Sequence, residues 1–287
     1  MFLAPSLVVL AVVAGWPLLR TFWFSLTDAN LSGMERARFV GLANFKELMS
    51  DERWWQSVWT TFRFALISVA LETVLGLMIA LVLNARFRGR GLLRAAVLVP
   101  WAIPTVVSAR MWGWMFNDVY GVVNEILLAL GVVEEGLAWT ADPDLALAAV
   151  VAVDVWKTAP FMTLLILAAL QTLPEDVYEA AQIDGAGRIR QFFSITIPQL
   201  KYTIITSTTL IVVGSLVFFD LIFVLTAGGP GDATRVLALD MYKRGFMSNQ
   251  MGPASVIATI LVVLGLLLAL LLRRLGGSTT ASQQEGA

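Results

Sequence analysis

Six long apolar stretches constrain what this chain can fold into more than any other feature of its sequence. Each is long enough for an α-helix that crosses a bilayer, which needs about 20 mainly apolar residues. Inside a bilayer every backbone N–H and C=O group must find an internal partner, so such stretches form helices. The six predicted spans are residues 2–26, 61–83, 95–116, 145–170, 203–226 and 253–272.

The composition supports a membrane protein and excludes several classes of site. Of the 287 residues, 58% are apolar and 14% are charged, whereas about a quarter of the residues in a soluble domain are charged. The net charge of −1 provides no basic surface for nucleic acid. The chain has no Cys and no His, which excludes disulfides, thiol nucleophiles, imidazole bases and most zinc sites. We therefore expect an all-α membrane protein that has no catalytic residues and no metal site.

Two of the six spans have alternative interpretations. The first could be a cleaved signal peptide, but it lacks a basic start and its apolar run is longer than usual. The third contains Pro100, Pro104 and Arg110, so it is predicted to be a kinked helix packed against its neighbours.

The distribution of basic residues predicts the orientation of the spans. Four arginines lie between positions 86 and 94, whereas the loop 117–144 has six acidic residues and no Lys or Arg. Basic residues favour the cytoplasmic side, so both termini are predicted to be cytoplasmic in a bacterial or archaeal inner membrane. The four basic residues of the first loop weaken this assignment. We expect one transmembrane domain, 1–272, and a disordered cytoplasmic tail, 273–287.

The loop between the fourth and fifth spans has the pattern of a short helix. Acidic residues suit its first turn, and Gly185 can end it in a left-handed conformation. A surface-lying amphipathic connector is the ordinary interpretation of such a loop. At i, i+3, i+4 and i+7 spacing, one helix face would present Val177, Ala180, Ala181 and Asp184.

The same loop carries a spaced motif. It runs Glu179-Ala180-Ala181, three residues, Gly185, nine residues, and then Ile195-x-Ile197-Pro198. This pattern resembles the EAA loop of ABC-importer permeases, with Ile197 where the family has Leu. The resemblance implies a coupling helix, within about residues 172–200, that docks on a separate ATPase subunit. It further implies that Glu179 makes a polar contact there, Ala180 and Ala181 allow close approach, and Gly185 makes the turn.

The likeness extends over nearly the whole chain and narrows to the sugar branch, the maltose/trehalose/glycerol-3-phosphate type first permease. Supporting stretches are residues 41–45, 98–104, 154–161, 170–174 and 218–230. The resemblance implies a type I ABC-importer permease with six transmembrane helices. Its implied partners are a second homologous permease, two ATPase subunits, an extracytoplasmic sugar-binding protein and membrane lipid. The chain lacks a phosphate-binding loop, so ATP and Mg are expected on the ATPase subunits and no cofactor on this chain.

Charged residues inside spans are costly and mark candidate functional positions. Here they are Glu72, Arg110, Asp154, Lys157 and Asp220. Asp154 and Lys157, at i and i+3, can instead neutralise each other on one helix. Asp220 can likewise pair with Arg110 or lie near the outer interface.

The resemblance also implies a substrate path. Family contacts fall in the span before the coupling loop and in the span after it. Matched through the W-x-x-x-P-[FY] segment at Trp156, and less securely in the later span, they become Asp154, Lys157, Thr158, Phe161, Ser215, Phe219 and Asp220. Polar groups suit sugar hydroxyls and aromatic faces suit the C–H side of the ring.

The expected function is that of a transport subunit and not an enzyme. We predict an ATP-driven, binding-protein-dependent sugar importer, with trehalose or maltose as lead substrates. Glycerol-3-phosphate or an amino acid is the alternative within transport, although a phosphate ester would call for more cationic path residues. An ion-coupled carrier using Asp154 and Asp220 is a second alternative, but it gives no account of the EAA-like loop. An intramembrane enzyme with paired acids has no supporting motif.

Overall fold

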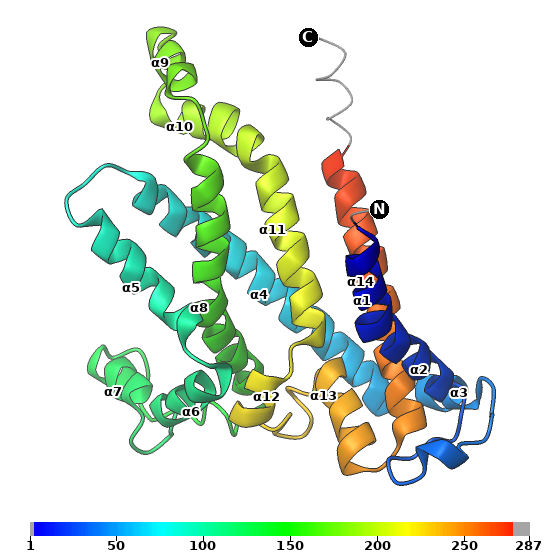
Figure 1. Ribbon diagram of the computed structural model, residues 1–287. Coiled ribbons are helices and arrows are strands. Elements are labelled where there is room, and N and C mark those ends of the chain that lie inside the picture. Colours follow the sequence, from blue (N-terminus) through cyan, green and yellow to red (C-terminus); the bar gives the residue numbers. More distant parts are fainter. Residues whose placement is uncertain (1–2, 278–287) are drawn as a thin grey trace.

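The regular elements of this computed structural model, which describes residues 3–277, are helices (Figure 1). Within that range the only β-bridge is an isolated one between Thr27 and Phe39. The first span runs continuously over Ala4–Ser25 through α1 (Ala4–Leu10), η1 (Ala11–Gly15) and α2 (Trp16–Ser25). Its side chains are almost all exposed, as expected for a helix that faces lipid.

Four further helices are long and apolar enough to cross a membrane. One is α4 (Glu52–Asn84), which begins earlier than predicted because the Asp51 carboxylate accepts a hydrogen bond from the Arg53 N–H and caps the helix. The others contain α8 (Pro143–Leu170), α11 (Ile197–Val217) and α14 (Met251–Gly277). α14 runs past the predicted span end at residue 272, and the rest of the predicted tail, 278–287, lies outside the described residues.

The third predicted span differs from expectation. In place of one kinked helix over 95–116 the chain forms α5 (Arg90–Ala102) and α6 (Thr105–Met115), which meet at an angle of 93°. Pro104 lacks an N–H and forces the preceding residue into an extended conformation. Ile103 accordingly has ψ 133°, and the helix ends there. The pair counts as a sixth span only if both halves are taken together.

The fifth predicted span, 203–226, is also displaced. The helical run starts earlier, with α10 (Arg188–Gln191) and η3 (Phe192–Thr196) leading into α11. It ends at Val217, where Phe218 turns extended, and a separate short helix, α12 (Asp220–Leu225), follows. Both sides of this break are apolar, so hydropathy alone could not locate it. The ring of Phe218 stacks on Phe64 of α4 at 6.3 Å, which favours the extended turn.

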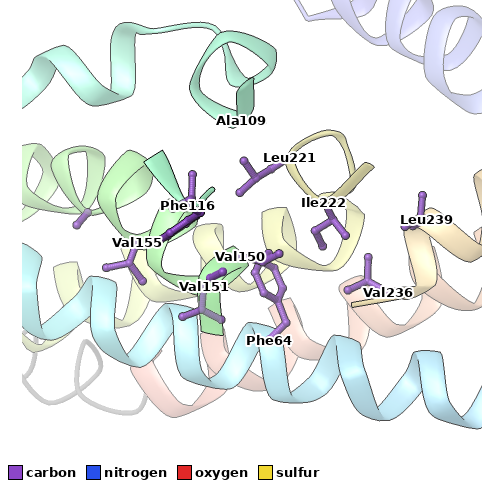
Figure 2. Packing of buried hydrophobic residues seen from close by; sticks show 13 residues of the cluster. Phe64, Ala109, Phe116, Val150, Val151, Val155, Leu221, Ile222, Val236 and Leu239 are labelled. Atoms are coloured by element: carbon purple, nitrogen blue, oxygen red, sulfur yellow. The ribbon is translucent and has the colours of Figure 1, made fainter. Parts of the chain in front are cut away.

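The most extensive helix–helix interface joins α4 and α8, and these two helices form the centre of the bundle. A close approach is possible there because Gly76 of α4 lies against Met162 of α8. One apolar cluster fills the interface toward α9 (Glu175–Ile183). A second cluster gathers α4, α6, α8 and α12 near Phe64 and Leu221, as Figure 2 shows.

The short elements lie at two opposite ends of the bundle (Figure 1). At one end, called here the α9 end, are α9, α10 and the turn between α4 and α5. At the other, called the α13 end, are α6, α7 (Val122–Ala129), α12 and α13 (Leu237–Tyr242). α3 (Ala43–Met49), η2 (Met34–Arg36) and η4 (Lys243–Met247) complete the described elements.

Candidate functional site: a protruding helix and buried polar residues in the spans

The helix α9 projects from the bundle at its end (Figure 1), and none of its residues is buried. Glu179 and Ala180 are exposed, and Ala181 is half-buried. Ile183 is 88% exposed, an unusual position for a large apolar side chain in a helix that does not face lipid. The face of α9 thus combines small, acidic and apolar groups that are available for a protein partner.

The turn after α9 has a defined geometry. Gly185 adopts a left-handed conformation at φ +76°, which only glycine adopts at no steric cost. The Ala186 N–H donates to the Ala181 carbonyl at 2.8 Å, and the Gly185 N–H donates to the Gln182 carbonyl at 3.0 Å. These two bonds form a Schellman motif, with Asp184 as the C-cap residue. The predicted glycine stop is therefore present in the structure.

Two side-chain hydrogen bonds hold the base of this hairpin. Gln191 Nε2 donates to the Ala186 carbonyl at 2.7 Å. The Tyr178 hydroxyl lies 2.9 Å from the Thr196 hydroxyl. Pro198, exposed in the first turn of α11, follows directly. α9 is thus joined to a membrane helix through a short, hydrogen-bonded connection.

A third connection joins α9 to the turn between α4 and α5. Arg86, in the turn between α4 and α5, forms an ion pair with Glu175 in the first turn of α9. Both side chains are largely exposed, so the pair contributes little stability. The ion pair does bring the connection between α4 and α5 close to the start of α9.

Within the spans, Asp154 lies on α8 and is 4% exposed. It lies next to Glu72 and Ser68 of α4 and next to Thr158 on its own helix. Glu72 is fully buried, and the enclosed oxygens of its carboxyl group have no hydrogen-bond partner among the described residues. The sequence singled out both acids but did not pair them, because the register of α4 against α8 is a tertiary property.

Lys157 does not form the ion pair with Asp154 that its sequence spacing allows. Its Nζ donates to the carbonyl of Ile103, the residue at the break between α5 and α6. No ion pair joins it to Asp154 within the described range, and none joins Asp220 to Arg110, which is exposed on α6. The freed carbonyl at a helix break is a nearby strong acceptor, so it takes the ammonium group. Asp154 and Asp220 nevertheless lie near enough to Lys157 to attract it.

The remaining path candidates fall into two groups. Phe161 of α8 stacks on Trp101 of α5, with ring centroids 5.6 Å apart, on the same helix as Thr158. Phe219 stacks on Tyr242 of α13 at 5.3 Å, beside the first residue of α12, Asp220. The hydroxyl of Ser215 donates back to the Ile211 carbonyl within α11. The α8 candidates therefore lie along one helix, while Ser215 and Phe219 lie at and after the end of α11. Asp220 lies near enough to Lys157 to join the two groups.

An ionic network at the α13 end was not predicted from the sequence. The fully buried carboxylate of Asp240 accepts from Arg235 Nη2 at 2.5 Å and from Arg244 Nε at 3.0 Å. Arg235 also bonds Asp232, and Arg244 also pairs with Asp51. The available signals were the i, i+4 spacing of Asp240 and Arg244 and the i, i+3 spacing of Asp232 and Arg235. The contact with Asp51 spans 193 residues and leaves no local pattern.

Comparison with known proteins identifies the family. The model of the family described as binding-protein-dependent transport system inner membrane component matches residues 72–279. The trehalose/maltose transport system permease protein MalF of Thermococcus litoralis is 46% identical over 267 residues, covering 92% of this chain and 89% of that protein. The sulfoquinovosyl glycerol transport system permease protein SmoG of Agrobacterium fabrum is 35% identical over 266 residues, with 93% and 86% covered.

A solved structure shows the same fold. A chain of a bacterial ABC transporter involved in the import of the acidic polysaccharide alginate superposes with a TM-score of 0.83 at 21% identity, covering 97% of this chain and 94% of that chain. The likeness confirms the predicted fold, a type I ABC-importer permease, and the family match confirms the resemblance noted at the EAA-like loop. The chain is a multi-pass membrane protein that belongs to the family of binding-protein-dependent transport system inner membrane components.

Proposed function

We propose that this chain is one permease half of an ATP-driven importer for a disaccharide of the trehalose/maltose kind. The observation that carries the proposal is α9, an exposed helix with a fixed glycine turn and a bonded base. The 46% identity to a trehalose/maltose permease supports the class of solute. A second permease of the same fold, two ATPase subunits and an external binding protein complete the importer.

In this proposal α9 is the coupling helix. Glu179 makes a polar contact with the ATPase, while Ala180 and Ala181 let the partner surface approach closely. ATP and Mg are bound by the ATPase subunits and not by this chain. Closure of those subunits displaces α9, and the base formed by Tyr178 and Thr196 passes the displacement to α11.

The proposed orientation places the α9 end in the cytoplasm. That end carries Arg86, Arg90 and Arg94, whereas the loop 117–144, at the α13 end, has no Lys or Arg. This asymmetry follows the rule that basic residues stay on the cytoplasmic side. The α13 end then faces the binding protein, and both termini are cytoplasmic.

For the solute we propose a path along α8. Asp154 and Thr158 offer groups for sugar hydroxyls, and Phe161 with Trp101 offers an aromatic face. Ser215, Phe219 and Asp220 extend the path toward the α13 end. Lys157 already donates to a backbone carbonyl, which favours a neutral sugar over a phosphate ester.

The test is uptake of labelled solutes by cells that lack this chain. The panel contains trehalose, maltose, a pentose, glycerol-3-phosphate and an amino acid. We expect loss of trehalose or maltose uptake, restored by the wild-type chain and insensitive to dissipation of the ion gradients while ATP is present. Unchanged disaccharide uptake would contradict the solute assignment. Uptake that follows the ion gradient in vesicles without ATP would contradict the importer.

A further inference from the structure

The α9 end contains a cavity of about 620 Å³ with a strongly basic lining. Arg86, Arg90 and Arg94 contribute three guanidinium groups, and Glu175 is the one carboxylate among the lining residues. The hydroxyls of Tyr178 and Thr196 lie at the same wall. The cavity thus carries an excess of two positive charges together with several neutral hydrogen-bonding groups.

Most of the arginine donors remain available to a ligand. Arg86 pairs with Glu175. Arg94 donates one bond, from Nη2 to the Leu83 carbonyl at 3.0 Å, while its enclosed Nε has no partner within the described part of the chain. A guanidinium has five N–H groups, so each arginine can still bind an oxyanion. Phosphate suits this arrangement because guanidinium groups bind its oxygens in a bidentate manner.

The start of α5 adds to the attraction for an anion. Arg90 is the first residue of this 13-residue helix, and no side chain caps the N-terminus behind it. The first N–H groups of a helix lack intrahelical partners and carry the positive end of the helix dipole. The positive end of this dipole lies at Arg90, a lining residue of the cavity, and adds to the attraction for an anion there.

A second cavity, of about 260 Å³, adjoins the first and has the opposite character. The two share Arg94 and Gln171 in their linings. Beyond these residues the second cavity is bounded mainly by apolar side chains of α4, α5 and α8, namely Leu83, Val97, Leu98, Leu164, Leu167 and Ala168. A free phosphate would fill the basic cavity and leave the apolar one empty. A ligand with an anionic head and an aliphatic chain fills both.

The position fits a membrane lipid. Their linings place the first cavity where α4 ends and α5 begins, beside the end of α8, and the second next to it between α5 and α8. Both α4 and α8 are long and apolar enough to cross a membrane, so the first cavity lies at the ends of two spans. Basic pockets between membrane helices at this depth bind anionic headgroups. We infer that the two cavities form one site for an anionic phospholipid, with the phosphate among Arg86, Arg90 and Arg94 and an acyl chain between α5 and α8. The site lies beside the base of α9, so its occupancy stabilises the position of that helix.

The test measures lipid retention by the purified full-length chain with native mass spectrometry. The probes are dioleoyl phosphatidylglycerol, dioleoyl phosphatidylcholine and inorganic phosphate. We expect phosphatidylglycerol to be retained about tenfold more strongly than phosphatidylcholine, since each basic residue near the membrane surface adds attraction for an anionic lipid. Replacement of both Arg90 and Arg94 by Gln should remove that preference. The matched control replaces Arg273 and Arg274, exposed arginines at the end of α14, by Gln and should keep it.

A second variant tests the apolar half without touching a charge. Ala168 is exposed and lines the second cavity, so Ala168→Trp fills the groove and should weaken phosphatidylglycerol retention with the arginines intact. Equal retention of the two lipids by the wild-type chain would overturn the proposal. So would displacement of the lipid by millimolar inorganic phosphate combined with no effect of Ala168→Trp, because the ligand would then be a free phosphate. Loss of retention when partner subunits are bound would assign the cavity to the protein interface. These readouts do not depend on the transported solute, so their failure is distinguishable from failure of the proposed function.

Discussion

The hydroxyl of Tyr178 lies 2.9 Å from the hydroxyl of Thr196, and this contact joins the protruding helix α9 to the helical run that enters the membrane as α11. Among the described residues, the other side-chain bond from α9 to the bundle, between Glu175 and Arg86, joins two largely exposed groups and contributes little. Removal of the contact between Tyr178 and Thr196 should loosen α9 without disturbing the spans.

Tyr178→Phe should therefore increase hydrogen exchange of the α9 amides about threefold to tenfold, the equivalent of one net hydrogen bond. Thr196→Val should act similarly, and the double variant should add little to either single change. Solute uptake should fall in parallel. Tyr202→Phe, on exposed α11 surface, is the control. Unaltered exchange in α9 would show that this contact does not hold the helix.

The α4–α8 interface depends on a glycine. A Cβ atom at Gly76 would lie 2.6 Å from Met162 Cγ and 3.2 Å from the Thr163 backbone nitrogen. Gly76→Ala should therefore force the helices apart and lower the free energy of unfolding in mixed micelles by about 1–3 kcal/mol. Gly214→Ala on α11, where nothing lies within 4 Å, should be neutral or stabilising. Equal stability of the two variants would contradict the packing described here.

The ion pair between Asp51 and Arg244 predicts a pH dependence. Burial alone would raise the pKa of the Asp51 carboxyl. Hydrogen bonds from Arg244 and from the Arg53 backbone N–H, together with the positive charges of the two arginine side chains, outweigh burial and hold the pKa below its usual value. A carboxyl whose pKa is lowered on folding stabilises the fold above its unfolded pKa. That stabilisation is lost as the pH falls through the lowered value.

Asp51→Asn keeps the helix-capping oxygen and removes the charge. We expect the variant to be less stable than the wild type by about 1 kcal/mol or less at pH 7, because the pair is partly exposed. The difference should shrink below about pH 4 and vanish at lower pH. Urea unfolding curves between pH 7 and pH 3 measure it. A difference that grows toward low pH would have the wrong sign for this pair.

The bond from Lys157 to Ile103 fixes the break between α5 and α6. Lys157→Met leaves that carbonyl without a donor, which costs about 1–3 kcal/mol locally. The chain has no native Cys, so spin labels at Val99→Cys and Met111→Cys report the bend directly. We expect the distance distribution to be broader in Lys157→Met than in the otherwise unchanged labelled chain. Lys201→Met, on the exposed surface of α11, should leave the distribution unchanged. A narrow, unshifted distribution in Lys157→Met would contradict this role.

Local patterns predicted a large part of this molecule. Apolar length located the spans around α4, α8 and α14, and Gly185 located the end of α9, because each depends on neighbouring residues alone. The break after Val217 was missed because both of its sides are apolar. The 93° bend was predicted only as a kink, since Pro104 limits the backbone but its neighbours decide the angle.

The polar contacts were harder to predict. Asp154 and Glu72 were both singled out, yet their adjacency depends on the register between two helices. Neutralisation of Asp154 was one of two interpretations of Lys157, because sequence spacing cannot reveal a free carbonyl on another helix. The network around Asp240 requires segments that are far apart along the chain. The roles of Glu179, Ala180 and Ala181 at an ATPase remain predictions.

Coupling of an ATPase to the membrane helices through α9 is the central proposal. Changes at Gly185, in the turn after α9, test it most directly. Gly185 and Gly131 are matched: both end a helix in a Schellman motif, with φ +76° and +66°, and a Cβ at either would meet nothing within 4 Å. A valine is equally strained at each. They differ in location, since Gly131 follows α7 at the α13 end.

The measurement is uptake of labelled trehalose and maltose, normalised to the amount of chain in the membrane. Gly185→Val should lower uptake by about tenfold or more, since the strain of a left-handed valine opens the turn. Gly131→Val should retain most of it. Normal uptake by Gly185→Val, or an equal loss in both variants, would contradict the account of α9 as the coupling helix.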